Sequence, residues 1–119
     1  MAKAFRLQDK AAQVKFEWEK IEDVWEKVEE EIEELKSEIR KPKSENSVEE
    51  EFGDLLFALV NYARFLKVDP EAALERTNLK FIQRFKFIEE RAEKIKKPLK
   101  DMTLQEMDSI WNEAKLAGF

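Results

Sequence analysis

Apolar residues recur at steps of three and four through most of this chain, which is the spacing of one face of an α-helix. The clearest run lies between Glu17 and Arg40, and its apolar positions are Ile21, Val24, Val28, Ile32, Leu35 and Ile39. Pro42 follows, and proline interrupts a helix because it lacks a backbone N–H. The pattern predicts a helix over residues 17–40, preceded by a modest helix over residues 3–14.

Start signals predict three further helices. Ser47 followed by Glu50 is a capping-box pattern, in which each side chain bonds the backbone N–H of the other residue. It predicts a helix over residues 47–67. Asp69 before Pro70 has the form of an N-cap followed by proline at the first helical position, and it predicts a helix to about residue 96.

Thr103 with Glu106 is a second capping box and opens the last helix. Strand signals are nearly absent. The apolar seam expected on the helix that begins at Pro70 consists of Leu74, Phe81, Phe85, Ile88 and Ala92. The predicted fold class is therefore all-α.

The helix predicted over residues 47–67 is apolar around much of its circumference. At 100° per residue, Phe57 lies roughly opposite Val48 and Leu59. We therefore expect this helix to be buried on both sides, and an interface between two copies of the chain would explain that. The pattern favours a homodimer.

Length and composition agree with long helices in one domain. The chain has 119 residues, of which 43% are hydrophobic and 41% charged, with only two glycines and three prolines. We expect a single domain over residues 1–119. No apolar run approaches the roughly 20 residues that cross a bilayer, and the first ten residues lack the apolar stretch of a signal peptide, so we expect a soluble, cytoplasmic protein.

The charge and composition of the chain limit its possible binding partners and the chemistry that it could use. The 22 basic residues are spread among 27 acidic ones, for a net charge of −5, which gives no support to nucleic-acid binding. The chain has no cysteine and no histidine, so it cannot build a thiolate or imidazole metal site or a Ser-His-Asp triad. Any catalysis must use carboxylates, whose hard oxygens suit magnesium or manganese.

Two pairs of acidic residues share one spacing. Glu31 and Glu34 on one predicted helix, and Glu51 and Asp54 on the next, are each three residues apart and so lie on one helical side. Lys27 shares an arc with the first pair, and Asn61 lies in a stripe with the second. Two such stripes can face each other across an antiparallel hairpin.

Four carboxylates brought together repel one another, and a divalent cation would compensate their charge. The alternative is that these acids belong to a dense acidic run on a solvated helix face, because such runs are common in a chain this acidic. Spacing alone leaves both interpretations open.

Residues 27–35, KVEEEIEEL, and residues 48–57, VEEEFGDLLF, resemble the signature of the MazG family, E-E-x-x-E followed by E-x-x-D. The resemblance continues through residues 60–64 and 77–85 and into Trp111. Residues 6–18 are similar to the start of the C-terminal catalytic half of longer, two-domain members, whose first half would then be missing here. Lys15 stands where that similarity leads us to expect glycine.

The resemblance implies an enzyme that hydrolyses a nucleoside triphosphate between the α and β phosphates, giving the monophosphate and pyrophosphate. It also implies a dimer of four-helix-bundle type. By the same resemblance the metal ligands are Glu31, Glu34, Glu51 and Asp54, and the cofactor is magnesium, with manganese as a substitute.

The resemblance also implies residues that bind the substrate. Lys80 and Arg84, four residues apart, are assigned to the triphosphate, although ordinary surface cations would look the same. Lys27 and Asn61 are candidates to contact phosphate or order water. Trp111 either stacks on the nucleoside or is a plain core residue.

The general base is left open between two carboxylates, Glu30 and Glu34, because no histidine is present to activate water. No motif indicates the base or sugar of the substrate, since related all-helical enzymes act on dUTP, dCTP or phosphoribosyl-ATP. The alternative function is a non-catalytic helical adaptor or dimerisation module that binds a partner through the apolar face around Phe57.

Overall fold

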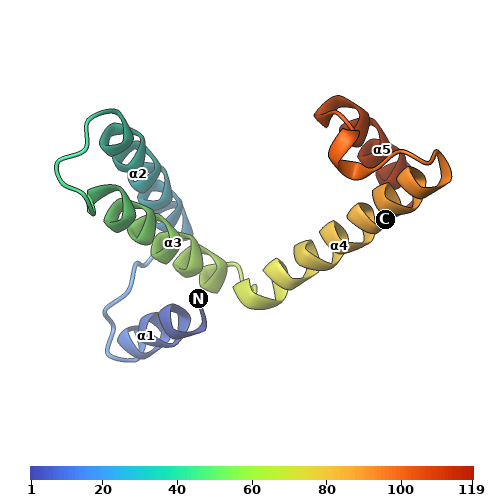
Figure 1. Cartoon of the computed structure of the whole chain (residues 1–119). Coiled ribbons are helices and arrows are strands. Elements are labelled where there is room, and N and C mark those ends of the chain that lie inside the picture. The colour runs from blue at the N-terminus through green and yellow to red at the C-terminus, as the bar shows by residue number, and fades with distance from the viewer. The chain divides into compact units, whose positions relative to one another are not determined.

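The computed structural model describes residues 1–119, and its regular structure is helical throughout (Figure 1). The all-α prediction is confirmed. In chain order the elements are α1 (Ala2–Gln13), α2 (Ile21–Arg40), α3 (Ser47–Phe65), α4 (Pro70–Lys94), the short 3-10 helix η1 (Leu99–Asp101) and α5 (Leu104–Leu116).

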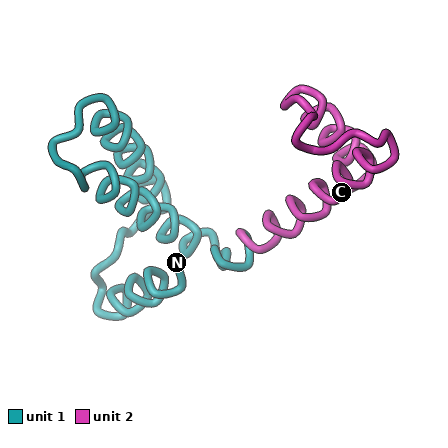
Figure 2. Tube along the Cα trace, in the orientation of Figure 1, with its two compact units in different colours: residues 1–73 teal, residues 74–119 magenta.

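The chain divides into two compact units, residues 1–73 and residues 74–119, which Figure 2 shows in different colours. The first unit holds both acidic motifs, and the second holds Lys80, Arg84 and Trp111. The expectation of a single domain over residues 1–119 stays a prediction.

The first unit is built on a hairpin of α2 and α3. Val24 and Val28 of α2, together with Ala58 and Val60 of α3, are buried, and burying these apolar side chains favours the pairing of the two helices. Helix α1 joins through Gln8, whose Nε2 donates a hydrogen bond of 2.8 Å to the carbonyl oxygen of Phe57. The hairpin holds the facing sides of α2 and α3 in a defined register.

The second unit has its own small core. Ile88 and Ala92 of α4 pack with Met102 and with Ile110 of α5. The predicted seam of α4 is only partly correct, because Leu74 is 47% exposed and Phe81 is 56% exposed. Phe81 contacts the ring of Trp111 within the unit, with 5.5 Å between the ring centroids, but only Ile88 and Ala92 of the seam are buried.

Three helices end on a lysine in the left-handed conformation. Lys15, Lys67 and Lys96 have φ angles of 66°, 62° and 56°. In each case the next residue's amide donates to a carbonyl five residues back, which is the bond of a Schellman motif; the pairs are Phe16 to Ala11, Val68 to Ala63 and Lys97 to Ala92. Left-handed backbone explains why glycine is expected at position 15.

The predicted start of the second helix is wrong by four residues. Helix α2 begins at Ile21, and residues 16–20 are not helical. The left-handed backbone at Lys15 turns the chain out of the helical path, and the carboxylate of Glu17 is held by an ion pair with Arg64 of α3. Residues 16–20 therefore form a connection held by this ion pair and do not extend α2 toward its N-terminus.

The predicted capping box of Ser47 and Glu50 does not form. The N-cap of α3 is Asn46, and no side chain caps it. The hydroxyl of Ser47 donates to the carbonyl oxygen of Ser44 at 2.9 Å and accepts from the Ser44 amide at 3.2 Å. This serine closes the preceding turn, which is a competing use of the same hydroxyl.

The other two start signals are confirmed. The Glu71 amide donates to Oδ1 of Asp69 at 3.0 Å, which caps α4. At α5, the Glu106 amide donates to Oγ1 of Thr103 at 3.0 Å, and the Thr103 amide donates to Oε1 of Glu106 at 3.3 Å. Both orphan donors of this capping box are satisfied.

Several apolar side chains of α3 are exposed, and they do not all lie on one side of the helix. Phe52, Leu56, Phe57 and Leu59 are between 41% and 51% exposed. Burial on both sides is therefore not found within one chain. Three large aromatic residues of the first unit, Phe16, Trp18 and Trp25, are also exposed. None of the helices combines the length and apolarity that crossing a bilayer requires.

Replacing Thr103 with alanine should destabilise the second unit by about 1 kcal/mol, because the Glu106 amide loses its acceptor.

The stability of the second unit should also depend on pH. The Lys97 ammonium, whose Nζ lies 2.9 Å from Oε2 of Glu106, and the Thr103 amide hold the pKa of Glu106 below its usual range. The contribution of Glu106 is thus present at neutral pH and is lost as the pH falls through that lowered pKa. Urea unfolding at neutral and acidic pH would measure both effects, with Ser109→Ala on α5 as the control. Equal stability of Thr103→Ala and wild type would contradict the assigned cap.

Candidate metal centre

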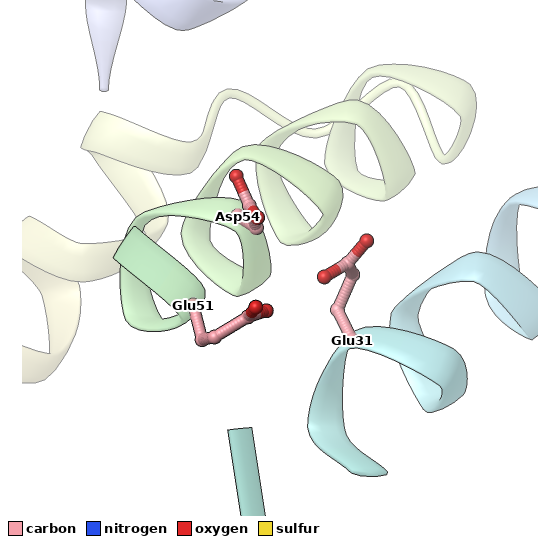
Figure 3. Close-up of side chains that lie close together, drawn as sticks. All are labelled: Glu31, Glu51 and Asp54. Carbon is pink, nitrogen blue, oxygen red and sulfur yellow. The ribbon is translucent and has the colours of Figure 1, made fainter. Parts of the chain in front are cut away.

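Three carboxylates converge where α2 faces α3. One oxygen from each of Glu31, Glu51 and Asp54 lies within 4.8 Å of the other two (Figure 3). Glu31 projects from α2, while Glu51 and Asp54 lie on one side of α3 because they are three residues apart. The predicted meeting of two acidic stripes across the hairpin is found for these three residues.

The centre contains buried oxygens without partners. Glu31 is only 5% exposed, and Glu51 is half-buried. The Oε2 atoms of Glu31 and Glu51 are buried and accept no hydrogen bond. Burying a carboxylate oxygen without a donor is costly, so native proteins normally satisfy such atoms with a hydrogen bond or a cation.

The donor set fits a hard divalent cation. All three residues offer carboxylate oxygens, which are the ligands that magnesium and manganese prefer. The two Oε2 atoms have no hydrogen-bond donor in the protein and are therefore available to a cation. These residues are therefore suited to hold magnesium.

Lys27 compensates part of the negative charge. Its Nζ lies 2.9 Å from Oε1 of Glu31 and 3.6 Å from Oε1 of Glu30. The hydrogen bond with Glu31, followed by the nearby negative charges, raises the pKa of Lys27 above its usual value. Lys27 therefore stays protonated beside the centre and neutralises one side of the Glu31 carboxylate.

Glu34 lies next to the group of three carboxylates but is not a member of it. The negative charge of Glu31 is the main cause that raises the pKa of Glu34, with smaller contributions from desolvation and from Glu51. The side chain is exposed. Its assignment as a fourth metal ligand or as a general base stays a prediction.

A cleft opens beside the centre along the C-terminal part of α2 and the connection to α3. It has a volume of about 670 Å³ and is lined by Glu34, Ser37, Glu38, Lys41, Pro42, Lys43 and Glu51. Residues 41–46 are a polar connection between two predicted helices, and the sequence indicates no role for its lysines. Only the folded connection brings Lys41 and Lys43 to the same cleft as two of the predicted ligands.

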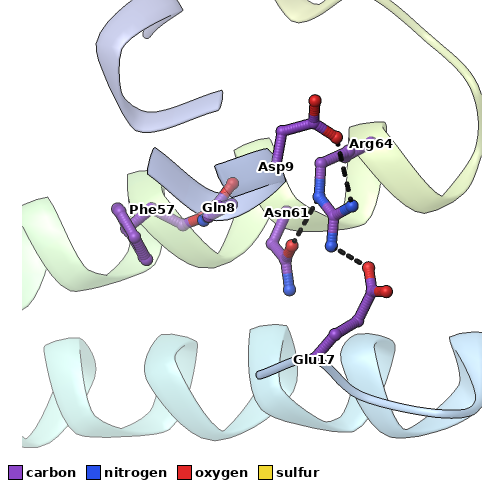
Figure 4. Close-up of polar contacts among 6 residues, drawn as sticks. All are labelled: Gln8, Asp9, Glu17, Phe57, Asn61 and Arg64. Carbon is purple, nitrogen blue, oxygen red and sulfur yellow. Dashed lines mark hydrogen bonds and ion pairs between the residues drawn. The ribbon is translucent and has the colours of Figure 1, made fainter. Parts of the chain in front are cut away.

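Asn61 belongs to a polar network centred on Arg64 (Figure 4). The Arg64 guanidinium donates from Nε to Oδ1 of Asn61 at 3.3 Å, and it forms ion pairs with Asp9 and Glu17. Sequence reasoning did not assign a role to Arg64, and the only signal was its place in the run that resembles the family. In the structure this arginine ties α1 and the following connection to α3.

Two of the residues predicted to bind substrate, Arg84 and Trp111, contact other residues of the second unit. Nε of Arg84 donates to the Phe119 carbonyl at 3.0 Å, and its guanidinium carbon lies 5.3 Å from the Trp111 ring centroid. Trp111 is half-buried against the core of this unit. Lys80 is exposed. The packing of Trp111 supports its core role and leaves a contact with nucleoside as a prediction.

Comparison with known proteins identifies relatives of the whole chain. Residues 19–88, which include both acidic motifs, match the MazG nucleotide pyrophosphohydrolase domain. The chain is 46% identical over 115 residues to the nucleoside triphosphate pyrophosphohydrolase/pyrophosphatase MazG of Thermotoga maritima. It is 36% identical over 116 residues to a nucleoside triphosphate pyrophosphohydrolase of Escherichia coli.

Each of these two matches covers 97% of the chain and 44% of the relative. The chain is also 56% identical to YabN, an uncharacterized protein of Bacillus subtilis, over 71 residues, which are 60% of the chain and 14% of that protein. The chain therefore spans less than half the length of these curated relatives.

Proposed function

This chain belongs to the MazG nucleotide pyrophosphohydrolase domain family, and from that premise we propose that it hydrolyses nucleoside triphosphates to nucleoside monophosphate and pyrophosphate. Water attacks, and the bond between the α and β phosphates breaks. The observation that carries the proposal is the convergence of Glu31, Glu51 and Asp54 with two buried oxygens that lack a partner.

The proposed metal ligands are Glu31, Glu51 and Asp54, joined by Glu34. Magnesium bound there would supply positive charge that stabilises the phosphate oxygens as the bond breaks. Lys27 holds the Glu31 carboxylate in place at 2.9 Å, which leaves the Oε2 atom of Glu31 free to act as a ligand.

Glu30 or Glu34 takes the proton from the attacking water. The raised pKa of Glu34 supports its use as a base, because a base works best when its pKa approaches the working pH. Glu30 is 57% exposed at the side chain and is attracted to Lys27. The effect of the Glu31 charge on the pKa of Glu34 supports assigning this role to Glu34.

Several residues are proposed to contact the substrate. Lys27 and Asn61 lie beside the acidic motifs, and Lys80 and Arg84 carry the family resemblance in α4. Arg84 would have to exchange its bond with the Phe119 carbonyl for a phosphate oxygen, and Trp111 would offer a ring edge or face to the nucleoside.

Release of pyrophosphate from a panel of nucleotides tests the proposed function. The purified chain with magnesium is expected to act on at least one of the common ribo- and deoxyribonucleoside triphosphates, damaged nucleotides, dUTP, dCTP or phosphoribosyl-ATP. Manganese should substitute for magnesium. Absence of pyrophosphate release across this panel, from folded protein, would overturn the proposal.

We also propose that two copies associate through α3. Support comes from the exposed apolar residues Phe52, Leu56 and Leu59, which share one side of α3, and from Phe57 on another side, because exposed apolar surface of this kind commonly marks an interface. Light scattering should give about twice the 14.2 kDa of one chain. A mass of one chain would contradict the homodimer.

The same exposed apolar residues support the alternative function, a non-catalytic adaptor or dimerisation module. The two functions differ in their response to ligands, because an adaptor gains no stability from magnesium and nucleotide. Unchanged thermal unfolding with both added would favour the adaptor.

A further inference from the structure

The lining of the cleft beside the acidic centre contains residues of both charges. Glu34, Glu38 and Glu51 come from α2 and α3, and Lys41 and Lys43 come from the connection between these helices. Such a pairing suits a ligand that carries several negative charges and binds a cation at one end. A polyphosphate has both properties, since its oxygens can contact a metal ion and ammonium groups together.

The two lysines are not engaged in ion pairs. Lys27, Lys36 and Lys97 each have a carboxylate oxygen within 4.0 Å, whereas Lys41 and Lys43 have none. An ammonium that lines a cleft without a carboxylate partner keeps its three donors available for an incoming anion.

Glu38 holds the connection that carries these lysines. This residue is 6% exposed, and its Oε1 accepts a hydrogen bond of 2.9 Å from the backbone amide of Lys43. Ser47 at the other end of the connection bonds to Ser44. The backbone of Lys43 is therefore anchored at the wall of the cleft, and its flexible side chain alone has to adapt to a ligand.

We propose that Lys41 and Lys43 bind the pyrophosphate part of the substrate, with Glu38 as a positioning residue. This inference rests on the proposed function and extends it by assigning the β and γ phosphates to this cleft. The nucleoside does not fit the lining equally well, because Pro42 is the only apolar residue there and no aromatic ring is available for a base.

The cleft should bind pyrophosphate only when the metal is present. Its lining holds three carboxylates, those of Glu34, Glu38 and Glu51, against two ammonium groups. Without a cation the anion would meet net negative charge. Pyrophosphate together with magnesium should raise the thermal unfolding temperature, and pyrophosphate alone should not.

The variant Lys41→Gln with Lys43→Gln tests the assignment. Product inhibition by inorganic pyrophosphate should weaken by about tenfold, since charged hydrogen bonds to phosphate are lost, while inhibition by the nucleoside monophosphate should not change. Lys36→Gln removes the same type of charge from α2 outside the cleft and should leave both inhibition constants unchanged. Lys43→Arg should retain most of the pyrophosphate affinity.

Equal weakening of both products, or no weakening of pyrophosphate, would overturn the assignment. Wild-type protein that releases no pyrophosphate from any nucleotide would instead overturn the proposed function. In that case the thermal shift with magnesium and pyrophosphate still decides the inference, because loss of the shift in the double variant supports it and retention overturns it. Both lysines are exposed, so the variants should fold.

Discussion

Glu51→Gln should lower pyrophosphate release by at least about a thousandfold, which corresponds to roughly 4 kcal/mol of transition-state stabilisation. Glu51 supplies one of the two buried oxygens that have no protein partner. Glutamine keeps the size of the side chain but removes its negative charge. Initial rates at saturating magnesium would measure the loss, and raising magnesium further should recover only part of it.

Glu49→Gln is the matched control for this experiment. Glu49 lies on α3, two residues from Glu51, but its side chain is exposed. The substitution removes the same charge without touching the acidic centre, so the rate should change little. A similar loss in both variants, or full activity in Glu51→Gln, would mean that the charge of Glu51 has no special role.

Magnesium should stabilise the wild-type protein, by about 2.7 kcal/mol when its concentration is a hundred times the dissociation constant. Glu34→Gln should have two opposite effects. It should raise the unfolding temperature of the metal-free protein, because the charge of Glu31 opposes ionisation of Glu34 in the folded state. It should also reduce the stabilisation that magnesium gives, because one proposed ligand is weakened.

Thermal unfolding with a chelator and then with magnesium would measure both effects of Glu34→Gln. The control is Glu33→Gln, since Glu33 is 71% exposed at the side chain and pairs with Lys36. That variant should unfold like the wild type in both conditions. If Glu34→Gln destabilises the metal-free protein, repulsion between Glu31 and Glu34 does not dominate the acidic centre.

Much of the hairpin and its acidic centre could be predicted because helical periodicity is a local property. The spacing of Glu51 and Asp54 on one helix and the position of Glu31 on the other allowed them to face each other across a hairpin, although spacing alone left a solvated acidic face as the alternative. The same spacing and the family resemblance also placed Glu34 in this group, but its relation to the three converging residues depends on side-chain positions that periodicity does not determine.

The features that could not be predicted depend on which of several possible local contacts a side chain makes. Ser47 matches a capping box, yet its hydroxyl bonds to Ser44, because the turn before α3 offers a donor and an acceptor nearby. The lysines of the cleft could not be predicted, since nothing in a six-residue polar connection indicates which way it folds. In the structure, Glu38 helps to hold this connection through its bond to the backbone amide of Lys43.

The left-handed backbone at three lysines restricts which residues this fold accepts at those positions. Lys15, Lys67 and Lys96 are exposed, and yet their backbone excludes β-branched side chains more strongly than most core positions do. In a mutational scan these three surface sites would tolerate glycine and asparagine and reject valine and isoleucine. Intolerance at an exposed position can therefore record backbone geometry, and it should not be mistaken for contact with a substrate.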